Sequence, residues 1–467
     1  MSHVSLKCTA CGNLHDSSMD TIQCPDCGEP VDVRYGPNRQ TGDHTWAGVP
    51  IPMPYHQTGQ SVTLGEGNTP VVAVNWVAGE VGIQNVDAKL EYMNPTGSFK
   101  DRGTAVMMSV AKELGVTEVV EDSSGNAGAS VSAYAGRAGI IAHVFAPANA
   151  PEAKLQQIKV YGAQTHSIEG PREATTQAAI DYYQQRGLVY ASHNLSPYFL
   201  EGTKTFAYEL AASPAGVPDH VIIPVGNGAL FIGAWKGFQE LLAAGRIDKT
   251  PKMHAIQADG VMPVAAAFAG KRWTLEDSRP TIAGGISVAT PPRKQQVVDI
   301  LFASGGRSIA VDDASIVWWQ KAMASKEGIY CEPAGAAALA QRELAAATGV
   351  ALGTVSNRLR RLHETGVLRG FLPDIDAEQA GFTLTTIMQM RIAKGQIIAV
   401  QASVAEHPRV FGVYDVTGEW DSLVLARFRD RAEMDAFIKS TLSQPHIERT
   451  NTSLVLNTVK QEPRVIV

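Results

Sequence analysis

The chain of 467 residues contains no apolar run near the roughly 20 residues that a membrane helix requires, and no low-complexity tail. No secretory signal precedes its first cysteines, so we do not expect disulfide bonds among them. A formal net charge of −6 gives the chain no general attraction for nucleic acid. These absences argue against a membrane-spanning helical protein and a disulfide-stapled secreted domain, and they predict a cytosolic protein of several domains.

Cysteine is scarce, with five residues, but four of them form two CxxC pairs. Twelve residues separate the pairs, and a glycine follows each pair. Two such pairs place four thiolates around one tetrahedral ion, as in a zinc ribbon. We therefore predict a ribbon in residues 1–35 and a structural Zn²⁺ held by Cys8, Cys11, Cys24 and Cys27. Residues 36–60, rich in Pro, Gly and polar residues, are interpreted as the connection to the next domain.

Lys100 lies in the run KLEYMNPTGSFKDRG, residues 89–103, between a tight polar turn and a helix expected over residues 104–114. Most lysines are solvated surface charges, so the position alone decides nothing. A lysine shielded at a helix start has its charged form disfavoured, which helps it attack a carbonyl as a free amine. With the loops downstream, Lys100 indicates a carrier for an aldehyde cofactor, pyridoxal phosphate, held as a Schiff base.

Two small-residue loops follow the lysine, each between an expected strand and an expected helix. Residues 123–128 (SSGNAG) follow the strand 117–120, and residues 224–230 (PVGNGAL) lie between the strand 220–223 and the helix 231–243. This order places loop amides and a helix dipole around one anion. For residues 123–128, the alternative is an ordinary glycine-rich loop without a ligand. Residues 224–230 lack the GxGxxG pattern of a dinucleotide site, which makes nicotinamide binding the weaker interpretation. We expect a substrate carboxylate at the first loop and the cofactor phosphate at the second.

Six segments together resemble the threonine synthase family, within the tryptophan synthase β-like pyridoxal phosphate enzymes. They are residues 64–70 (LGEGNTP), 89–103, 123–128, 202–205 (GTKT), 224–230 and 332–336 (EPAGA). The resemblance implies an α/β fold of two open α/β subdomains, PLP-dependent fold type II, over residues 60–342. It also implies a lyase of threonine biosynthesis that converts O-phospho-L-homoserine and water to L-threonine and phosphate.

The resemblance assigns roles to individual residues. Lys100 would carry the cofactor and act as the catalytic base, and Asn126 would contact the oxygen of the cofactor ring. The cofactor phosphate would be held by Gly226, Asn227, Gly228, Ala229 and Leu230, and the substrate by Ser98, Ser123, Ser124 and Gly125.

Two stretches depart from the family pattern. Residues 196–202 read SPYFLEG, so Phe199 occupies the position where many members have an arginine that pairs with the substrate phosphate. After Gly335 the chain lacks the Ser/Thr-Gly-x-Gly segment whose hydroxyl faces the pyridine nitrogen in the family. These departures leave open a lyase of threonine dehydratase or cysteate synthase type, or an amino-acid-responsive DNA-binding regulator with a degenerate cofactor domain.

Residues 343–461 resemble the leucine-responsive (AsnC-type) regulators. Helices expected over residues 343–347 and 353–363 form a partial helix-turn-helix within residues 343–372. Residues 342–370 carry five arginines against two glutamates, an excess that suits contacts with DNA phosphates. An amphipathic surface helix with arginines on its solvent face is the alternative.

The last part of the chain reads as strands over residues 384–392, 410–416, 422–428 and 447–459, with helices over 396–406 and 431–442. The order βαββαβ predicts a ferredoxin-like domain in residues 381–461. In AsnC-type regulators this domain oligomerises and binds an amino acid, and the turn with Gly418 and Asp421 lies near the effector site. The resemblance therefore implies a homo-oligomer with an amino-acid effector, beside the small-molecule substrate of the enzyme.

Overall fold

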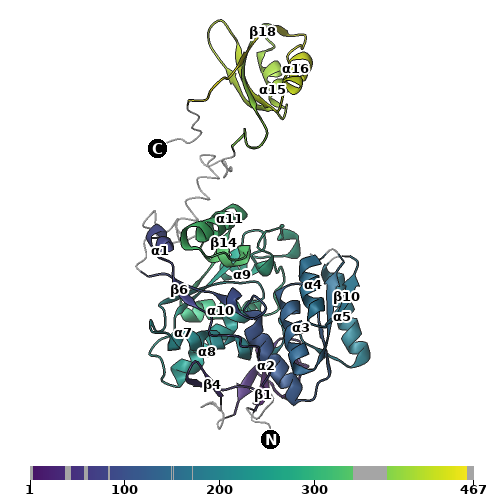
Figure 1. Ribbon diagram of the computed structural model, residues 1–467, viewed down its shortest axis with the longest axis vertical. Helices are drawn as coiled ribbons and strands as arrows, with labels where there is room; N and C mark the ends of the chain where they lie inside the picture. Colours follow the sequence, from purple (N-terminus) through teal and green to yellow (C-terminus); the bar gives the residue numbers. More distant parts are fainter. Residues whose placement is uncertain are drawn as a thin grey trace. The chain divides into compact units, whose positions relative to one another are not determined.

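The computed structural model describes residues 4–36, 44–56, 61–81, 85–148, 150, 152–170, 172–339 and 376–459 (Figure 1). The chain divides into two compact units, residues 1–368 and 369–467, each with its own hydrophobic core. The helix-turn-helix-like segment predicted for residues 343–372 lies outside the described residues. No helix of the described ranges combines the length and apolar character that a membrane span requires.

Two parallel sheets organise the first unit. Strand and helix alternate along the chain, and each helix returns the chain to the same sheet edge, which makes neighbouring strands parallel. The first sheet has the order β10 (Gln164–Ile168), β9 (Ile141–Pro147), β8 (Glu118–Glu121), β11 (Val189–Tyr190), and the second has the order β12 (His220–Pro224), β13 (Lys252–Ala258), β14 (Arg307–Val311). These sheets match the two open α/β subdomains expected from the sequence.

Helices cover both sheets. Figure 1 shows α3 (Asn126–Ala138), α4 (Glu152–Val160) and α5 (Arg172–Arg186) gathered around the first sheet, where α3 and α5 contact β9. The helices α8 (Ala229–Ala243) and α10 (Lys294–Ser304) contact β13 of the second sheet. The helix predicted over residues 104–114 is α2 (Lys100–Glu113), so Lys100 is its first residue.

Shorter segments complete this unit. They are α1 (Asn75–Val81), α6 (Pro197–Thr203), α7 (Thr205–Ala212), α9 (Pro263–Phe268), α11 (Asp313–Ala322) and α12 (Pro333–Ala336), with the hairpin of β6 (Val71–Ala73) and β7 (Asp87–Lys89). The described part of the unit ends in a 3₁₀ turn at Ala337–Leu339.

The helices α2 and α6 approach each other closely. A Cβ atom on Gly202 would lie 1.8 Å from the carbonyl oxygen of Arg102, and one on Gly103 would lie 2.6 Å from the Phe199 ring. Only glycine leaves room for this contact. Phe199 is fully buried, so the residue at the expected phosphate-binding position is part of the core between these helices.

The N-terminal residues form a three-stranded antiparallel sheet with the order β2 (Leu14–Asp16), β1 (Val4–Cys8), β3 (Val31–Tyr35). The segment interpreted as a connection, residues 36–60, is more structured than expected in its described part. It contains a hairpin of β4 (His44–Trp46) and β5 (Val49–Ile51), and both Ile51 and Met53 are buried in the main core. Burial of these two apolar side chains is the physical reason that a Pro-rich stretch is ordered here.

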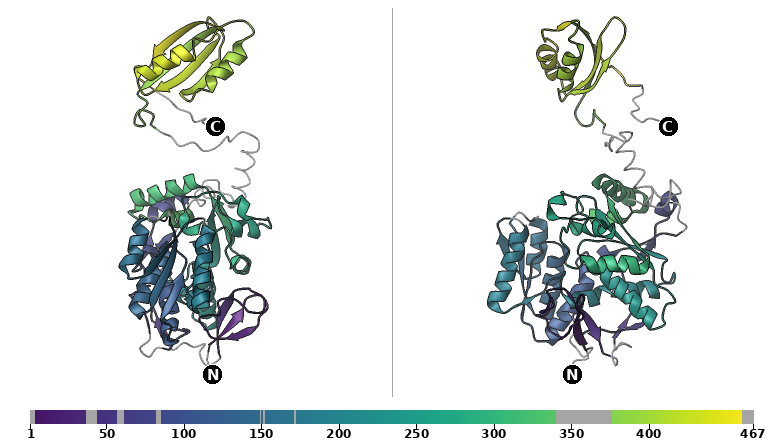
Figure 2. Two further views of the ribbon diagram at one scale, coloured as in Figure 1. Left: turned by 90° about the vertical axis from the view of Figure 1, so that its right-hand side faces the viewer. Right: turned by 180° about the vertical axis from the view of Figure 1, so that it is seen from behind.

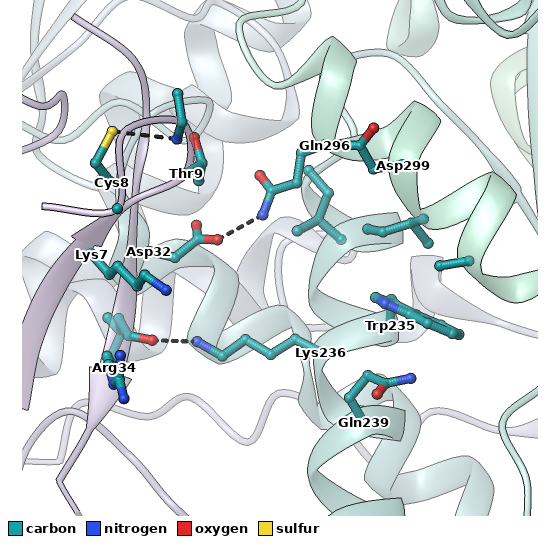
Figure 3. Close-up of a pocket in the computed structure, with 16 residues that line it drawn as sticks. Lys7, Cys8, Thr9, Asp32, Arg34, Trp235, Lys236, Gln239, Gln296 and Asp299 are labelled. Atoms are coloured by element: carbon teal, nitrogen blue, oxygen red, sulfur yellow. Dashed lines mark hydrogen bonds between the residues drawn. The ribbon is translucent and has the colours of Figure 1, made fainter. Parts of the chain in front are cut away.

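The N-terminal sheet is fastened to the helices of the second subdomain. The Arg293 guanidinium donates to Asp32 at 2.8 Å and to the Val31 carbonyl at 2.8 Å. Figure 3 shows two further hydrogen bonds across a groove between this sheet and α8 and α10. Gln296 donates to Asp32 at 2.6 Å, and Lys236 donates to a carbonyl of β3 at 2.8 Å.

The second unit confirms the predicted order of strands and helices. Its elements are β15 (Leu384–Ile392), α15 (Ile397–Ala405), β16 (Val410–Asp415), β17 (Ser422–Phe428), α16 (Arg431–Ser440) and β18 (Ile447–Leu454). The sheet is antiparallel with the order β16-β17-β15-β18, as in a ferredoxin-like fold, and its last strand ends at Leu454 and not at residue 459. Figure 2 shows both helices on one face of the sheet, where Met388, Val404 and Phe437 form the core.

Candidate active site

Lys100 is half-buried at the start of α2, and its Nζ lies 4.0 Å from the centroid of the Phe99 ring. Burial lowers the pKa of the Lys100 ammonium to about 8, while the negative charges of Glu121 and Glu332 act in the opposite direction. A lysine with this pKa has an appreciable fraction of free amine near neutral pH. Attack on an aldehyde requires that free amine.

The turn before Lys100 is held by Asp101. Its fully buried carboxylate accepts hydrogen bonds from the Thr96 amide at 2.7 Å and the Thr96 hydroxyl at 2.5 Å. Ser130 of α3 donates to the same carboxylate at 2.7 Å. Ser98, predicted to contact substrate, is buried in this turn, and its hydroxyl accepts from the Lys100 amide at 3.4 Å. The lysine is therefore fixed relative to α3.

Arg102, the next residue of the helix, is the centre of a buried charge network. Its guanidinium pairs with Glu91 at 2.7 Å and with Glu209 of α7 at 2.6 Å, and Lys89 pairs with Glu209 at 2.7 Å. Burial raises the pKa of Glu209, but the bonds and charges of Arg102 and Lys89 outweigh it and lower that pKa to about 2. The network anchors the start of α2 to segments far away in the sequence.

The first predicted loop leads directly into α3, which begins at Asn126. The Gly125 amide donates to the Ser123 hydroxyl at 3.3 Å. A Cβ atom on Gly128 would lie 1.9 Å from the Ser123 carbonyl oxygen, so a glycine is needed for the helix to pass this close. Ser123, Ser124, Gly125 and Asn126 remain half-buried and can reach a ligand.

The second predicted loop packs closely against residues 285–288. A Cβ atom on Gly226 would lie 3.1 Å from the Ile286 Cα and 3.1 Å from the Val288 side chain. Gly228 has φ of +88° and directly precedes α8, whose first residues are Ala229 and Leu230. The amides at a helix start have no partner within the helix and attract an anion. The remaining predicted residue of the loop, Asn227, is half-buried.

An acidic residue lies near each loop. Glu121 ends β8 two residues before Ser123, and Glu332 is seated next to Gly285, whose Cβ would lie 3.0 Å from the Glu332 carboxylate. The Gly285 carbonyl in turn borders Gly226. The negative charges of both acidic residues raise the pKa of Lys100 against the effect of burial. An amine of lowered pKa and a glycine cradle at a helix start fit an aldehyde cofactor that carries a phosphate, as pyridoxal phosphate does.

One pair at this site was not predicted from the sequence. The fully buried Glu121 places its Oε1 2.9 Å from Nδ1 of His193, a buried residue that follows β11. The strands β8 and β11 are neighbours in the sheet, although the two residues are 72 positions apart. The sequence does show an acidic residue, Glu121, at the end of an apolar strand. It does not indicate that His193 is the partner of this residue.

The four predicted metal-binding cysteines converge, with their sulfur atoms all within 4.8 Å of one another. Cys8 and Cys27 are 3.4 Å apart, Cys11 and Cys24 are 3.7 Å apart, and all four are free thiols. His15 places its Nε2 3.3 Å from the Cys24 sulfur and so borders the cluster. Four thiols at this spacing can hold one metal ion.

Comparison with known families decides the class of the larger site. Residues 62–355 match the family described as pyridoxal-phosphate dependent enzyme, a span of more than half of the chain. The chain belongs to this family. A second match, to the Lrp/AsnC ligand binding domain, covers residues 385–465 of this pyridoxal-phosphate dependent enzyme.

Similar proteins refine this placement. The threonine synthase of Methanocaldococcus jannaschii is 36% identical over 357 residues, which cover 72% of this chain and 85% of that protein. The threonine synthase of Methanosarcina acetivorans is 33% identical over 347 residues, which cover 72% of this chain and 85% of that protein. Among solved structures, maize serine racemase aligns with 65% of this chain and 94% of its own, at 26% identity and a TM-score of 0.52.

Proposed function

We propose that the chain is a threonine synthase that converts O-phospho-L-homoserine and water to L-threonine and phosphate. The observation that carries the proposal is Lys100, a half-buried amine of lowered pKa at the start of α2, in a chain whose two glycine-rich loops each lead into a helix. Relatives named threonine synthase, 33–36% identical over most of their length, support this substrate over that of other lyases.

The chemistry divides between the cofactor and the chain. Pyridoxal phosphate, when bound, supplies an electron sink for the charge that develops at the substrate α-carbon. Lys100 would hold the cofactor and, once its amine is free, remove the α-proton. Asn126 would contact the cofactor ring oxygen, and the amides of Gly226–Leu230 would hold the cofactor phosphate. Ser98 and the 123–125 loop would orient the substrate carboxylate.

The substrate phosphate needs a cation other than residue 199, because Phe199 is fully buried against Gly103. We propose Lys154. This exposed residue of α4 has its Nζ 3.8 Å from the Cβ position of Gly125, on the rim of the first loop. Gln157 of the same helix donates to the Thr96 carbonyl at 3.4 Å, which places α4 beside the turn that holds Lys100.

The test is equal release of threonine and phosphate when the cofactor-loaded chain receives O-phospho-L-homoserine. Lys154→Ala should raise KM for this substrate by about tenfold, the loss expected when one charged partner of a phosphate is removed. Lys159→Ala, on the same helix, is the control and should leave KM unchanged. Release of ammonia and a keto acid from threonine, with no product from phosphohomoserine, would instead indicate the dehydratase alternative.

We further propose that the cysteine cluster holds a structural Zn²⁺, since four thiolates fill a tetrahedral site and leave no open position.

The proposed domains are the zinc ribbon of residues 1–35, the catalytic domain of residues 60–342, the helix-turn-helix-like segment of residues 343–372 and the effector domain of residues 381–461. DNA contact by the third, a homo-oligomeric assembly and a cytosolic location stay predictions from the sequence.

The match to a ligand binding domain supports an amino-acid effector of the second unit. In the turn proposed to lie near the effector, the Asp421 carboxylate accepts from the Ile392 amide at 2.8 Å, and Gly418 has φ of +125°. Calorimetric titration of the full chain with L-threonine or L-methionine should give saturable heat, with D-threonine as the control. Absence of heat from both L-amino acids would contradict these two effectors.

A further inference from the structure

Two histidines and a tyrosine meet between the first sheet and α5, in a group that the proposed function does not use. His143 of β9 is buried, and its Nδ1 lies 3.3 Å from Nε2 of His166 on β10 and 3.2 Å from the hydroxyl oxygen of Tyr182 on α5. The three ring centroids lie 5.1–5.5 Å from one another. In Figure 1, β10 lies beside α5, and this helix contacts β9 as well. We call these three residues the histidine cluster.

The histidine cluster is separate from the candidate active site. Phe145, two residues after His143, packs with Ala179 of α5, whereas Val144 packs with Ala129 of α3. Successive side chains of a strand point to opposite faces of the sheet, so His143 lies on the α5 face. The loop proposed to hold the substrate carboxylate leads into α3, which packs on the other face.

Glu118, the first residue of β8, orients His143. Its carboxylate lies 2.8 Å from Nε2 of His143, and because an ionised carboxylate only accepts, this nitrogen carries the ring proton. In the neutral ring, Nδ1 then directs a lone pair toward His166 and Tyr182. A carboxylate on the far nitrogen is the arrangement that orients histidines bound to metal ions. The charge of Glu118 also offsets that of Arg186, whose guanidinium carbon lies 4.5 Å from the centroid of the Tyr182 ring.

The spacing of the cluster fits a metal ion. One lone pair on Nδ1 serves one good hydrogen bond, yet two polar atoms lie within 3.3 Å of it. With bonds of about 2.0–2.1 Å, two ligand atoms of a tetrahedral site lie about 3.3–3.4 Å apart. The observed separations of 3.3 and 3.2 Å are close to this value. A metal ion would use the lone pairs of all three residues together.

We propose that the histidine cluster is a second metal site, which binds a divalent transition metal ion such as Zn²⁺ through His143 Nδ1, His166 Nε2 and the Tyr182 hydroxyl oxygen. Imidazole nitrogen is a preferred ligand of such ions, and three protein ligands leave a fourth position for water. The ion can enter from solvent, because His166 and Tyr182 are half-buried and the Glu118 side chain is 34% exposed. Once bound, it joins α5 to both β9 and β10.

The new site is weaker than the cysteine cluster. Four thiolates bring four negative charges to their ion, whereas the histidine cluster brings at most one, from Tyr182. We therefore expect the chain purified without added metal to lack this ion, and the site to fill when Zn²⁺ is supplied.

The test is equilibrium dialysis of the full chain against Zn²⁺ in the presence of a weak competing chelator, with bound zinc measured by atomic emission. The wild type should gain one zinc per chain beyond its content before dialysis. His166→Phe keeps a ring to stack on Phe145, where the centroids are 4.3 Å apart, and should gain none. Tyr182→Phe keeps its ring and should raise the Kd of the additional ion about tenfold or more.

The matched control is Tyr183→Phe, at the next position of α5, whose ring stacks on Tyr190 outside the cluster. It should bind the additional ion as the wild type does. Added Zn²⁺ should raise the thermal midpoint of the wild type and of Tyr183→Phe and leave that of His166→Phe unchanged, because an ion bound only by the folded chain stabilises it.

Two results would overturn the second site. One is a wild type that gains no zinc, which would leave the histidine cluster as a hydrogen-bonded group. The other is an additional zinc that Tyr182→Phe binds with unchanged affinity, which would place the ion elsewhere on the chain. The second result decides the question even if His166→Phe fails to fold. Neither measurement depends on turnover or on pyridoxal phosphate, so the outcome is independent of the proposed reaction.

Discussion

Lys100→Ala should reduce turnover of O-phospho-L-homoserine by about 10⁴-fold or more, because the change removes both the cofactor carrier and the proposed base. The lowered pKa of Lys100 and its place at the start of α2 are specific to this lysine among the described residues. The same variant should lose the visible absorbance of attached pyridoxal phosphate. Phosphate release and the absorbance spectrum, recorded on one preparation, measure both effects.

Lys112→Ala is the matched control, since Lys112 lies in the last turn of the same helix, remote from the two loops. It should keep the absorbance and the turnover of the wild type. Persistent turnover in Lys100→Ala would refute the assignment of the cofactor carrier.

Cys24→Ser should remove the bound zinc and lower the thermal midpoint of the whole first unit. Closed zinc sites contribute about 10–16 kcal/mol of apparent binding free energy in zinc-finger peptides, and that energy is coupled to folding. Here Cys24 and Cys8 are buried in the same core as residues of α6 and α8. Arg293 also joins the N-terminal sheet to the start of α10. Loss of the ion should therefore loosen the second subdomain as well as the first thirty residues.

Metal analysis by atomic emission and differential scanning calorimetry measure these two effects. Cys331→Ser is the control, because Cys331 is a half-buried thiol outside the cluster, and it should retain one zinc per chain. An unchanged metal content in Cys24→Ser would refute the four-thiolate site.

Local sequence patterns predicted the parts of the site that depend on neighbouring residues. Gly128 and Gly228, one in each loop, lie where an added Cβ atom would collide with the Ser123 backbone and the Val297 side chain, and a helix begins within each segment. The cysteine pairs converge because each CxxC brings two sulfurs together and one sheet joins the pairs. The order of strands and helices in the second unit was also readable, because its strands alternate buried and exposed residues.

Interactions between distant residues could not be predicted in this way. Arg102 reads as an ordinary helix-start residue, yet its partner Glu209 lies 107 positions away on α7. The pairing of Glu121 with His193 depends on which strand lies next to β8, and periodicity does not determine strand order. Phe199 replaces the arginine that many family members have at this position, and the sequence alone did not show that the packing of α6 on α2 buries its side chain.

The glycine contact between α2 and α6 also constrains motion. Because the Cα atom of Gly202 packs directly against the Arg102 carbonyl, neither helix can rotate or slide against the other without a clash. Lys100 and the segment after β11 therefore behave as one rigid body on timescales shorter than local unfolding. Any hinge that admits substrate must therefore lie outside the contact between these two helices.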